Sequence, residues 1–191
     1  MTFRKLQIAV MAFMIFVTII LWKDKILETY SAITVDILLL NALLFFAVYY
    51  SSNFISKLHR MANWRLTISF FDNEGVKVPY FGVFYVLLMI SALPVFAYIE
   101  EVIFRNGTNS WMEGIVRSII FAALHILSGM KLASFPLFIL MGMWFTYQYF
   151  LGGVELSTVH HTCYNLVIFS LVFIQVLQRD AVAGVARLRG A

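Results

Sequence analysis

Two neighbouring carboxylates and an arginine end one of the apolar stretches of this sequence. The residues are Glu100, Glu101 and Arg105. On a helix, a spacing of four places Glu101 and Arg105 on one face, where they can form an ion pair, while Glu100 points elsewhere. This spacing predicts two different roles, because Glu101 is held by Arg105 and Glu100 is available as a general base. The alternative is an ordinary ion pair at a helix end that reaches interfacial water.

Two further clusters place histidines inside apolar stretches. In one, Phe121 and His125 are four residues apart and share a helix face. In the other, His161 and Asn165 share a face, with Ser157 one turn earlier on the same stripe. Ionisable side chains inside an apolar span are costly, and as a rule they face the interior of a helix bundle and serve a function. The structural alternatives are a core histidine bonded to a neighbouring helix and polar contacts between two helices.

Together the clusters supply the groups that hydrolyse an amide bond without a covalent intermediate: a carboxylate base, imidazoles and donors that polarise an oxyanion. Glu100, His125 and His161 would also satisfy a zinc site with an open position for water. The sequence has no H-E-x-x-H helix, however, which disfavours zinc. Cys163 is two residues from His161 and points to nearly the opposite helix face, so a cysteine–histidine nucleophile pair is not predicted.

Composition indicates which elements carry these clusters. Of 191 residues, 62% are hydrophobic and 13% are charged, and the mean hydropathy is +0.87. Since a soluble surface needs about 25–35% charged side chains, this composition excludes a free cytosolic enzyme, a disordered chain and a nucleic-acid-binding module. The single cysteine excludes an intrachain disulfide. The net charge of +4 fits contact with the anionic inner leaflet of a membrane.

Six apolar runs bounded by charged residues could each cross a hydrocarbon core of about 30 Å. We therefore predict an all-α polytopic membrane protein with about six transmembrane helices and a four-helix catalytic core. Two N-terminal helices and a basic interfacial segment form residues 1–79, the catalytic core spans 80–177, and a short basic tail that frays covers 178–191. The six runs are 6–22, 31–50, 80–100, 114–129, 133–150 and 156–177.

The distribution of basic residues predicts the orientation of these spans, because basic loops are retained on the cytoplasmic side. With six spans, 10 of the 14 Lys and Arg residues fall on the side that holds both termini. We therefore expect a protein of the prokaryotic plasma membrane with both termini in the cytoplasm. Glu100 then lies toward the outer end of the third span and His161 near the outer start of the sixth. This placement predicts a site that opens toward the non-cytoplasmic side.

Taken in order, the three clusters resemble the signature motifs of the CPBP family, which contains the type II CAAX prenyl endopeptidases and the bacteriocin-processing or immunity proteins, also called Abi proteins. The resemblance covers about residues 80–177. The motifs are E-E-x-x-x-R at 100–105, F-x-x-x-H at 121–125 and H-x-x-x-N at 161–165. The family's better-known members have about eight spans, whereas this sequence predicts only two before the core.

The resemblance implies an intramembrane glutamic-type protease that needs no cofactor. Carried over by motif, Glu100 with His125 would activate the attacking water. His161 and Asn165 would hold the tetrahedral oxyanion. This division of roles agrees with the one that helical geometry predicts from the residues alone.

The same resemblance implies that Glu101, Arg105 and Phe121 support the site structurally. The expected substrate is a membrane-associated peptide or protein, such as a CAAX-like tail, a leader peptide or a sorting tail. The lipid bilayer is the other expected partner; no nucleic acid is expected, and the oligomeric state is left open. Two alternatives stand beside the protease: a non-catalytic immunity or scaffold protein that uses the cluster for helix packing, and a zinc-dependent membrane protease.

Overall fold

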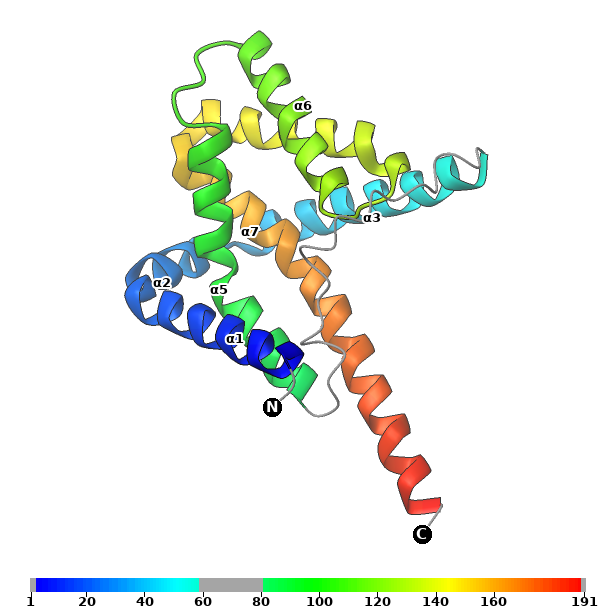
Figure 1. The fold of residues 1–191 in the computed structure, drawn as a ribbon. Coiled ribbons are helices and arrows are strands. Elements are labelled where there is room, and N and C mark those ends of the chain that lie inside the picture. Colours follow the sequence, from blue (N-terminus) through cyan, green and yellow to red (C-terminus); the bar gives the residue numbers. More distant parts are fainter. Residues whose placement is uncertain (1–2, 59–80, 190–191) are drawn as a thin grey trace.

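The computed structural model describes the backbone of residues 3–58 and 81–189, and the side chains of 8–58, 82–179 and 181. The described chain is all helix and connecting loop, with no strand in either described range, which confirms the all-α part of the predicted fold class. Most of the predicted basic interfacial segment, residues 59–79, lies outside the described residues. The helices are α1 (Phe3–Leu21), α2 (Lys23–Ser31), α3 (Val35–Leu58), α5 (Phe81–Phe104), α6 (Trp111–Leu127), the 3-10 turn η2 (Leu132–Ser134) and α7 (Phe135–Arg189) (Figure 1).

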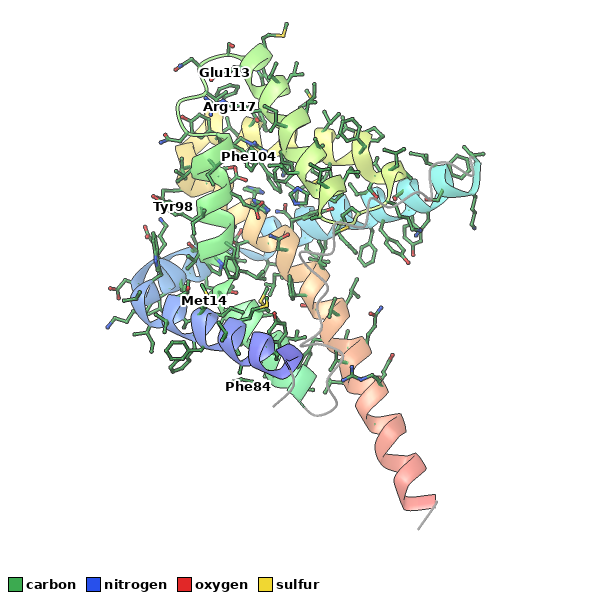
Figure 2. All side chains as sticks on the ribbon, viewed as in Figure 1. Met14, Phe84, Tyr98, Phe104, Glu113 and Arg117 are labelled. Carbon is green, nitrogen blue, oxygen red and sulfur yellow. The ribbon has the colours of Figure 1, made fainter. Side chains whose placement is uncertain are left out.

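Three described stretches are long and apolar enough to cross a membrane, which indicates an integral membrane protein. They are Val35–Leu58, Gly82–Phe104 and Leu132–Arg179. Large apolar side chains such as Met14 and Phe84 are exposed on the outside, as expected of a surface that meets lipid (Figure 2).

The predicted count of six spans is not confirmed. Helix α6 has 17 residues, and at 1.5 Å per residue it is about 25 Å long, shorter than a hydrocarbon core of about 30 Å. The apolar part of α1, Ile8–Leu21, is also short. The last two predicted runs lie within one long helical stretch, α7.

A break at two glycines divides α7 into two arms, 135–151 and 154–189. Gly152 has φ −152° and ψ 26°, and Gly153 has φ +68° and ψ −164°, so neither residue is helical. The positive φ of Gly153 is a conformation that residues with a Cβ rarely adopt. The two arms correspond to the predicted runs 133–150 and 156–177, and Figure 1 shows them, yellow and then orange to red, running in different directions.

Helix α7 is the centre of the fold, because α3, α5 and α6 all pack against it, while α1 and α2 pack on α5. Small residues allow α6 and α7 to approach closely. A Cβ on Gly114 of α6 would lie 2.5 Å from Thr146 Cγ2, and a Cβ on Gly142 of α7 would lie 2.8 Å from the Ser118 side chain. The second and third polar clusters of the sequence therefore sit on helices whose backbones approach closely.

Two predicted boundaries are wrong. Helix α3 continues to Leu58, eight residues beyond the end of the predicted run 31–50. Polar Ser51, Ser52 and Asn53 end the apolar run without ending the helix, because none of them breaks a helix as Pro would. The C-terminal segment from residue 178, expected to fray, is helical as far as Arg189.

Candidate active site

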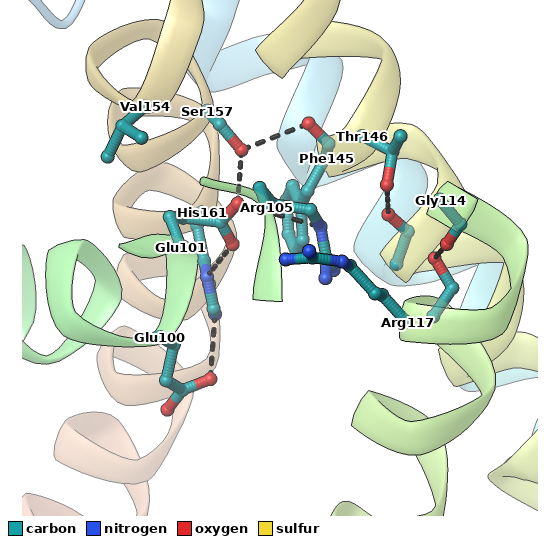
Figure 3. A network of polar contacts seen from close by, with 12 residues as sticks. Glu100, Glu101, Arg105, Gly114, Arg117, Phe145, Thr146, Val154, Ser157 and His161 are labelled. Atoms are coloured by element: carbon teal, nitrogen blue, oxygen red, sulfur yellow. Dashed lines mark hydrogen bonds and ion pairs between the residues drawn. The ribbon is translucent and has the colours of Figure 1, made fainter. Parts of the chain in front are cut away.

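A buried carboxylate, Glu101, is the centre of a polar network between the last turn of α5 and the second arm of α7 (Figure 3). His161 Nδ1 lies 2.7 Å from Glu101 Oε1, and the Ser157 hydroxyl donates to Glu101 Oε2. Arg105 Nε is 3.7 Å from the same Oε2, and both side chains are fully buried. Burial of a carboxylate is tolerated because a cation and hydrogen-bond donors surround it.

Local helix geometry explains which side chains face this carboxylate. Glu101 and Arg105 are one turn apart on α5, as predicted, and their ion pair is present. Ser157 and His161 are one turn apart on α7, and both reach Glu101. Ser157 Oγ also lies 3.0 Å from the main-chain oxygen of Phe145, so this hydroxyl links the two arms of α7 to α5.

The ring of His161 is held in one orientation. It stacks on Phe145 with a centroid distance of 4.5 Å and an interplanar angle of 16°, and it meets Phe121 at 6.0 Å. Since a carboxylate oxygen only accepts hydrogen bonds, Nδ1 donates to Glu101. The other ring nitrogen, Nε2, lies 3.7 Å from Glu100 Oε2. The two adjacent carboxylates therefore face the two nitrogens of the same imidazole.

Glu100 opens onto a cavity of about 350 Å³ between α5 and α6. The cavity is lined by Glu100, Phe104, Leu124, His125 and Ser128. The Glu100 side chain is 37% exposed, while its Oε2 is buried beside His161 and has no hydrogen-bond partner among the described residues. A carboxylate that lines a cavity and is partly exposed can accept a hydrogen bond from a bound water or substrate.

His125 forms the other polar side of the cavity. Its Nδ1 is 2.9 Å from the main-chain oxygen of Phe121, one turn earlier on α6. A carbonyl oxygen only accepts, so Nδ1 carries the proton and Nε2 is left as an acceptor. The ring lies 4.2 Å from the Phe121 ring and stacks on Phe138 at 4.8 Å, which fixes its orientation.

Arg105 is buried, and none of its three guanidinium nitrogens donates a hydrogen bond within the described part of the chain. Its charge is compensated by Glu101 and by the faces of two aromatic rings, Phe121 at 5.1 Å and Phe104 at 5.8 Å. Phe121, predicted to support the site, therefore contacts both Arg105 and His125. Arg105 contributes positive charge beside the two carboxylates.

The remaining polar residues of α7 have different positions. Asn165 is partly buried one turn beyond His161 and makes no hydrogen bond to another described residue, so its predicted contact with an oxyanion stays a prediction. His160, which the sequence ranks below His161, is buried with Nδ1 3.0 Å from Asn41 Nδ2 of α3. His160 therefore joins two helices and lies outside the network of Glu101.

The structure brings Glu100, Glu101, His125 and His161 together from three helices, as the motif order predicts. Two features were not predicted: the bond between Glu101 and His161, and the stacking of His161 on Phe145. The shared stripe of Ser157 and His161 was the only sign of the first feature, and the sequence carries no sign of the second. Among the side chains of 8–58, 82–179 and 181, no group of three or more His, Cys, Asp or Glu is arranged to hold a metal ion.

Comparisons of this chain with protein-family models, with curated proteins and with solved structures find no match.

Proposed function

We propose that this chain is an intramembrane endopeptidase of the CPBP type, which hydrolyses a peptide bond of a membrane-associated substrate with an activated water. The observation that carries the proposal is the convergence of Glu100 and His125 on one cavity, with His161 Nε2 beside Glu100. A carboxylate and an imidazole that share a cavity in an apolar protein match the needs of general acid–base catalysis.

In this proposal Glu100 takes a proton from a water in the cavity, and His125 Nε2 accepts the second hydrogen bond of that water. The water oxygen attacks the carbonyl carbon, which gives a tetrahedral intermediate with a negatively charged oxygen. The proton then passes from Glu100 to the amide nitrogen as the C–N bond breaks. The products are a carboxylic acid and an amine, and the acid then gives its proton to the amine, so the step needs no reactant besides water.

His161, protonated on both ring nitrogens between the two carboxylates, and Asn165 are the proposed donors to the oxyanion. Glu101 positions His161, because its carboxylate holds Nδ1 and turns Nε2 toward Glu100. Arg105 balances the charge of Glu101 inside an apolar environment. Donors that are fixed before the reaction stabilise developing charge without reorganisation, and removal of one such donor typically slows an enzyme by about 10²–10³-fold.

The proposed mechanism requires no metal. The alternative is zinc bound by Glu100, His125 and His161, which would activate the same water as a Lewis acid. Dialysis of the purified protein against a chelator separates the two mechanisms. We expect turnover to be unchanged by the chelator, whereas loss of turnover that zinc restores would favour the zinc enzyme.

The proposed substrate is a peptide held at the membrane, prenylated or not, such as a leader peptide or a sorting tail. The cavity lies between helices whose outer surfaces carry exposed apolar side chains, among them Ile103 and Ile120. A substrate anchored in lipid is concentrated next to such a surface. With both termini in the cytoplasm of a prokaryotic cell, the site would serve exported or surface-anchored substrates.

The test compares the termini of membrane proteins in cells that express the wild-type chain or Glu100→Gln. The amide keeps the shape of the side chain and loses the base. We therefore expect the abundance of the termini that appear only with the wild-type chain to fall about 10²–10⁴-fold. Glu155→Gln is the matched control, because Glu155 is exposed and pairs with Lys25 away from the cavity. Termini that persist with folded Glu100→Gln protein would reject the mechanism. If the chain is instead an immunity or scaffold protein, no terminus of a membrane protein should depend on expression of the wild-type chain or of either variant.

A further inference from the structure

The cavity beside Glu100 has a polar and an apolar part. Glu100 and His125 form the polar part. The hydroxyl of Ser128 donates to the main-chain oxygen of His125 at 2.7 Å, so it does not donate to a ligand in the cavity. Phe104 and Leu124 form the apolar part. A substrate that places its carbonyl at the polar part must place a neighbouring side chain against the apolar part.

The two apolar residues differ in how firmly they are held. Phe104 packs edge-on against Phe121, with ring centroids 5.4 Å apart, and the guanidinium of Arg105 lies 5.8 Å from its centroid. Its position is therefore set by the same residues that support the site. Leu124 is 49% exposed and precedes His125 on α6. Leu124 can therefore be replaced by a smaller or larger residue without disturbing the buried network.

The place of the cavity in the fold also favours contact with a substrate. Helices α5 and α6 each pack mainly on α7 and contact one another much less, and the cavity lies in the space between them. Leu124, which lines the cavity, is 49% exposed and lies in a run of apolar residues of α6. A peptide bound in the cavity beside Glu100 is therefore within reach of this side chain.

We propose that Leu124, together with Phe104, forms a subsite for an uncharged apolar side chain next to the scissile bond, and that the size of residue 124 determines which side chains are accepted. This inference rests on the endopeptidase function proposed above. A charged substrate side chain at this position would lose its hydration without gaining a partner from Phe104 or Leu124, which disfavours it strongly. In an apolar subsite, one methylene changes discrimination by about 10–200-fold.

The experiment changes the size of residue 124 and maps the cleavage sites. Cells express wild-type protein, Leu124→Ala, Leu124→Val or Leu124→Trp at equal abundance, and the termini of their membrane proteins are sequenced. Termini that disappear with Glu100→Gln define the cleavage sites. Ile120 provides the matched control, because it is also 49% exposed, lies one turn earlier on α6 and does not line the cavity.

With the wild-type protein, we expect the substrate side chains next to the scissile bond to be apolar. Leu124→Ala should raise the ratio of large to small side chains there by at least about tenfold, Leu124→Val should raise it less, and Leu124→Trp should lower it. Ile120→Ala and Ile120→Trp should leave it unchanged.

Cleavage sites that depend on Glu100 but keep the same size preference in every folded Leu124 variant would overturn the subsite and leave the endopeptidase intact. An equal shift in the Ile120 variants would also overturn it. Absence of Glu100-dependent termini from all cells would overturn the endopeptidase function and the subsite with it.

Discussion

The close contact of α6 with α7 predicts that one methyl group, Cγ2 of Thr146, decides whether Gly114→Ala stabilises or destabilises the protein. Gly114→Ala adds a Cβ that would lie 2.5 Å from Thr146 Cγ2, whereas carbon atoms in favourable contact are about 3.5–4.0 Å apart. Thr146 cannot simply rotate away, because its hydroxyl donates to the Gly142 carbonyl at 3.0 Å and the side chain is fully buried. The added methyl therefore overpacks the interface.

The expected size follows from two opposing effects. Overpacking costs about 1–3 kcal/mol, while alanine in place of glycine inside a helix gains about 1 kcal/mol. Gly114→Ala should therefore destabilise the wild-type protein by up to about 2 kcal/mol. Thr146→Ser removes Cγ2 and keeps the hydroxyl, and the next atoms of Thr146 lie 3.5 Å from the added Cβ, an ordinary contact. In the Thr146→Ser background, Gly114→Ala should stabilise the protein by about 1 kcal/mol.

The assay is equilibrium unfolding in mixed detergent micelles of four proteins: the wild type, Gly114→Ala, Thr146→Ser and the double variant. We expect a coupling free energy of about 1–3 kcal/mol between the two sites. Thr146→Ser alone is the control for the loss of a buried methyl, about 1 kcal/mol. If Gly114→Ala changes the free energy of unfolding equally in both backgrounds, then α6 and the first arm of α7 are farther apart than described.

Two further predictions concern the loop between α5 and α6 and the first turn of α6. Asn109 is exposed there, so Asn109→Cys in a Cys163→Ala background should react with a membrane-impermeant thiol reagent in intact cells if the site faces outward; reaction only after permeabilisation would reject that orientation. Glu113 lies before the predicted span that starts at 114, and the backbone N–H of Asn109 and the guanidinium of Arg117 lower the pKa of its carboxyl. This stabilisation is present above the ordinary pKa of a glutamate and is lost as pH falls through the lower native pKa. Glu113→Gln should therefore be less stable than the wild type at pH 7, and thermal unfolding should show the difference disappear at acidic pH; a difference that persists there would reject the assignment.

Much of the site could be predicted because it depends on local helix periodicity. The ion pair of Glu101 and Arg105 and the contact of Phe121 with His125 each join residues one turn apart, and both are present. The predicted helix ends were less accurate than the predicted contacts within a helix. The sequence placed a boundary at residue 51, where apolar residues end, but a helix ends only where its backbone hydrogen bonds end.

Contacts between helices could not be predicted in the same way. Glu101 was assigned only a bracing role with Arg105, yet it also holds His161, 60 positions away in the chain. The pairing of His160 with Asn41 joins residues 119 positions apart. Such contacts depend on how far each helix is rotated and shifted along its neighbour, and no local pattern carries that information.

The sequence alone determines that the chain is helical, that apolar surface dominates it, and which side chains share a face of each helix, because a period of 3.6 residues holds whatever lies alongside. The tertiary structure decides that Glu100 and His125 share a cavity and that His161 lies between two carboxylates. The physical reason is close packing, as where Gly114 and Gly142 let α6 and the first arm of α7 approach closely. Which polar residues of the three helices meet depends on how those helices pack together, and no local pattern determines that.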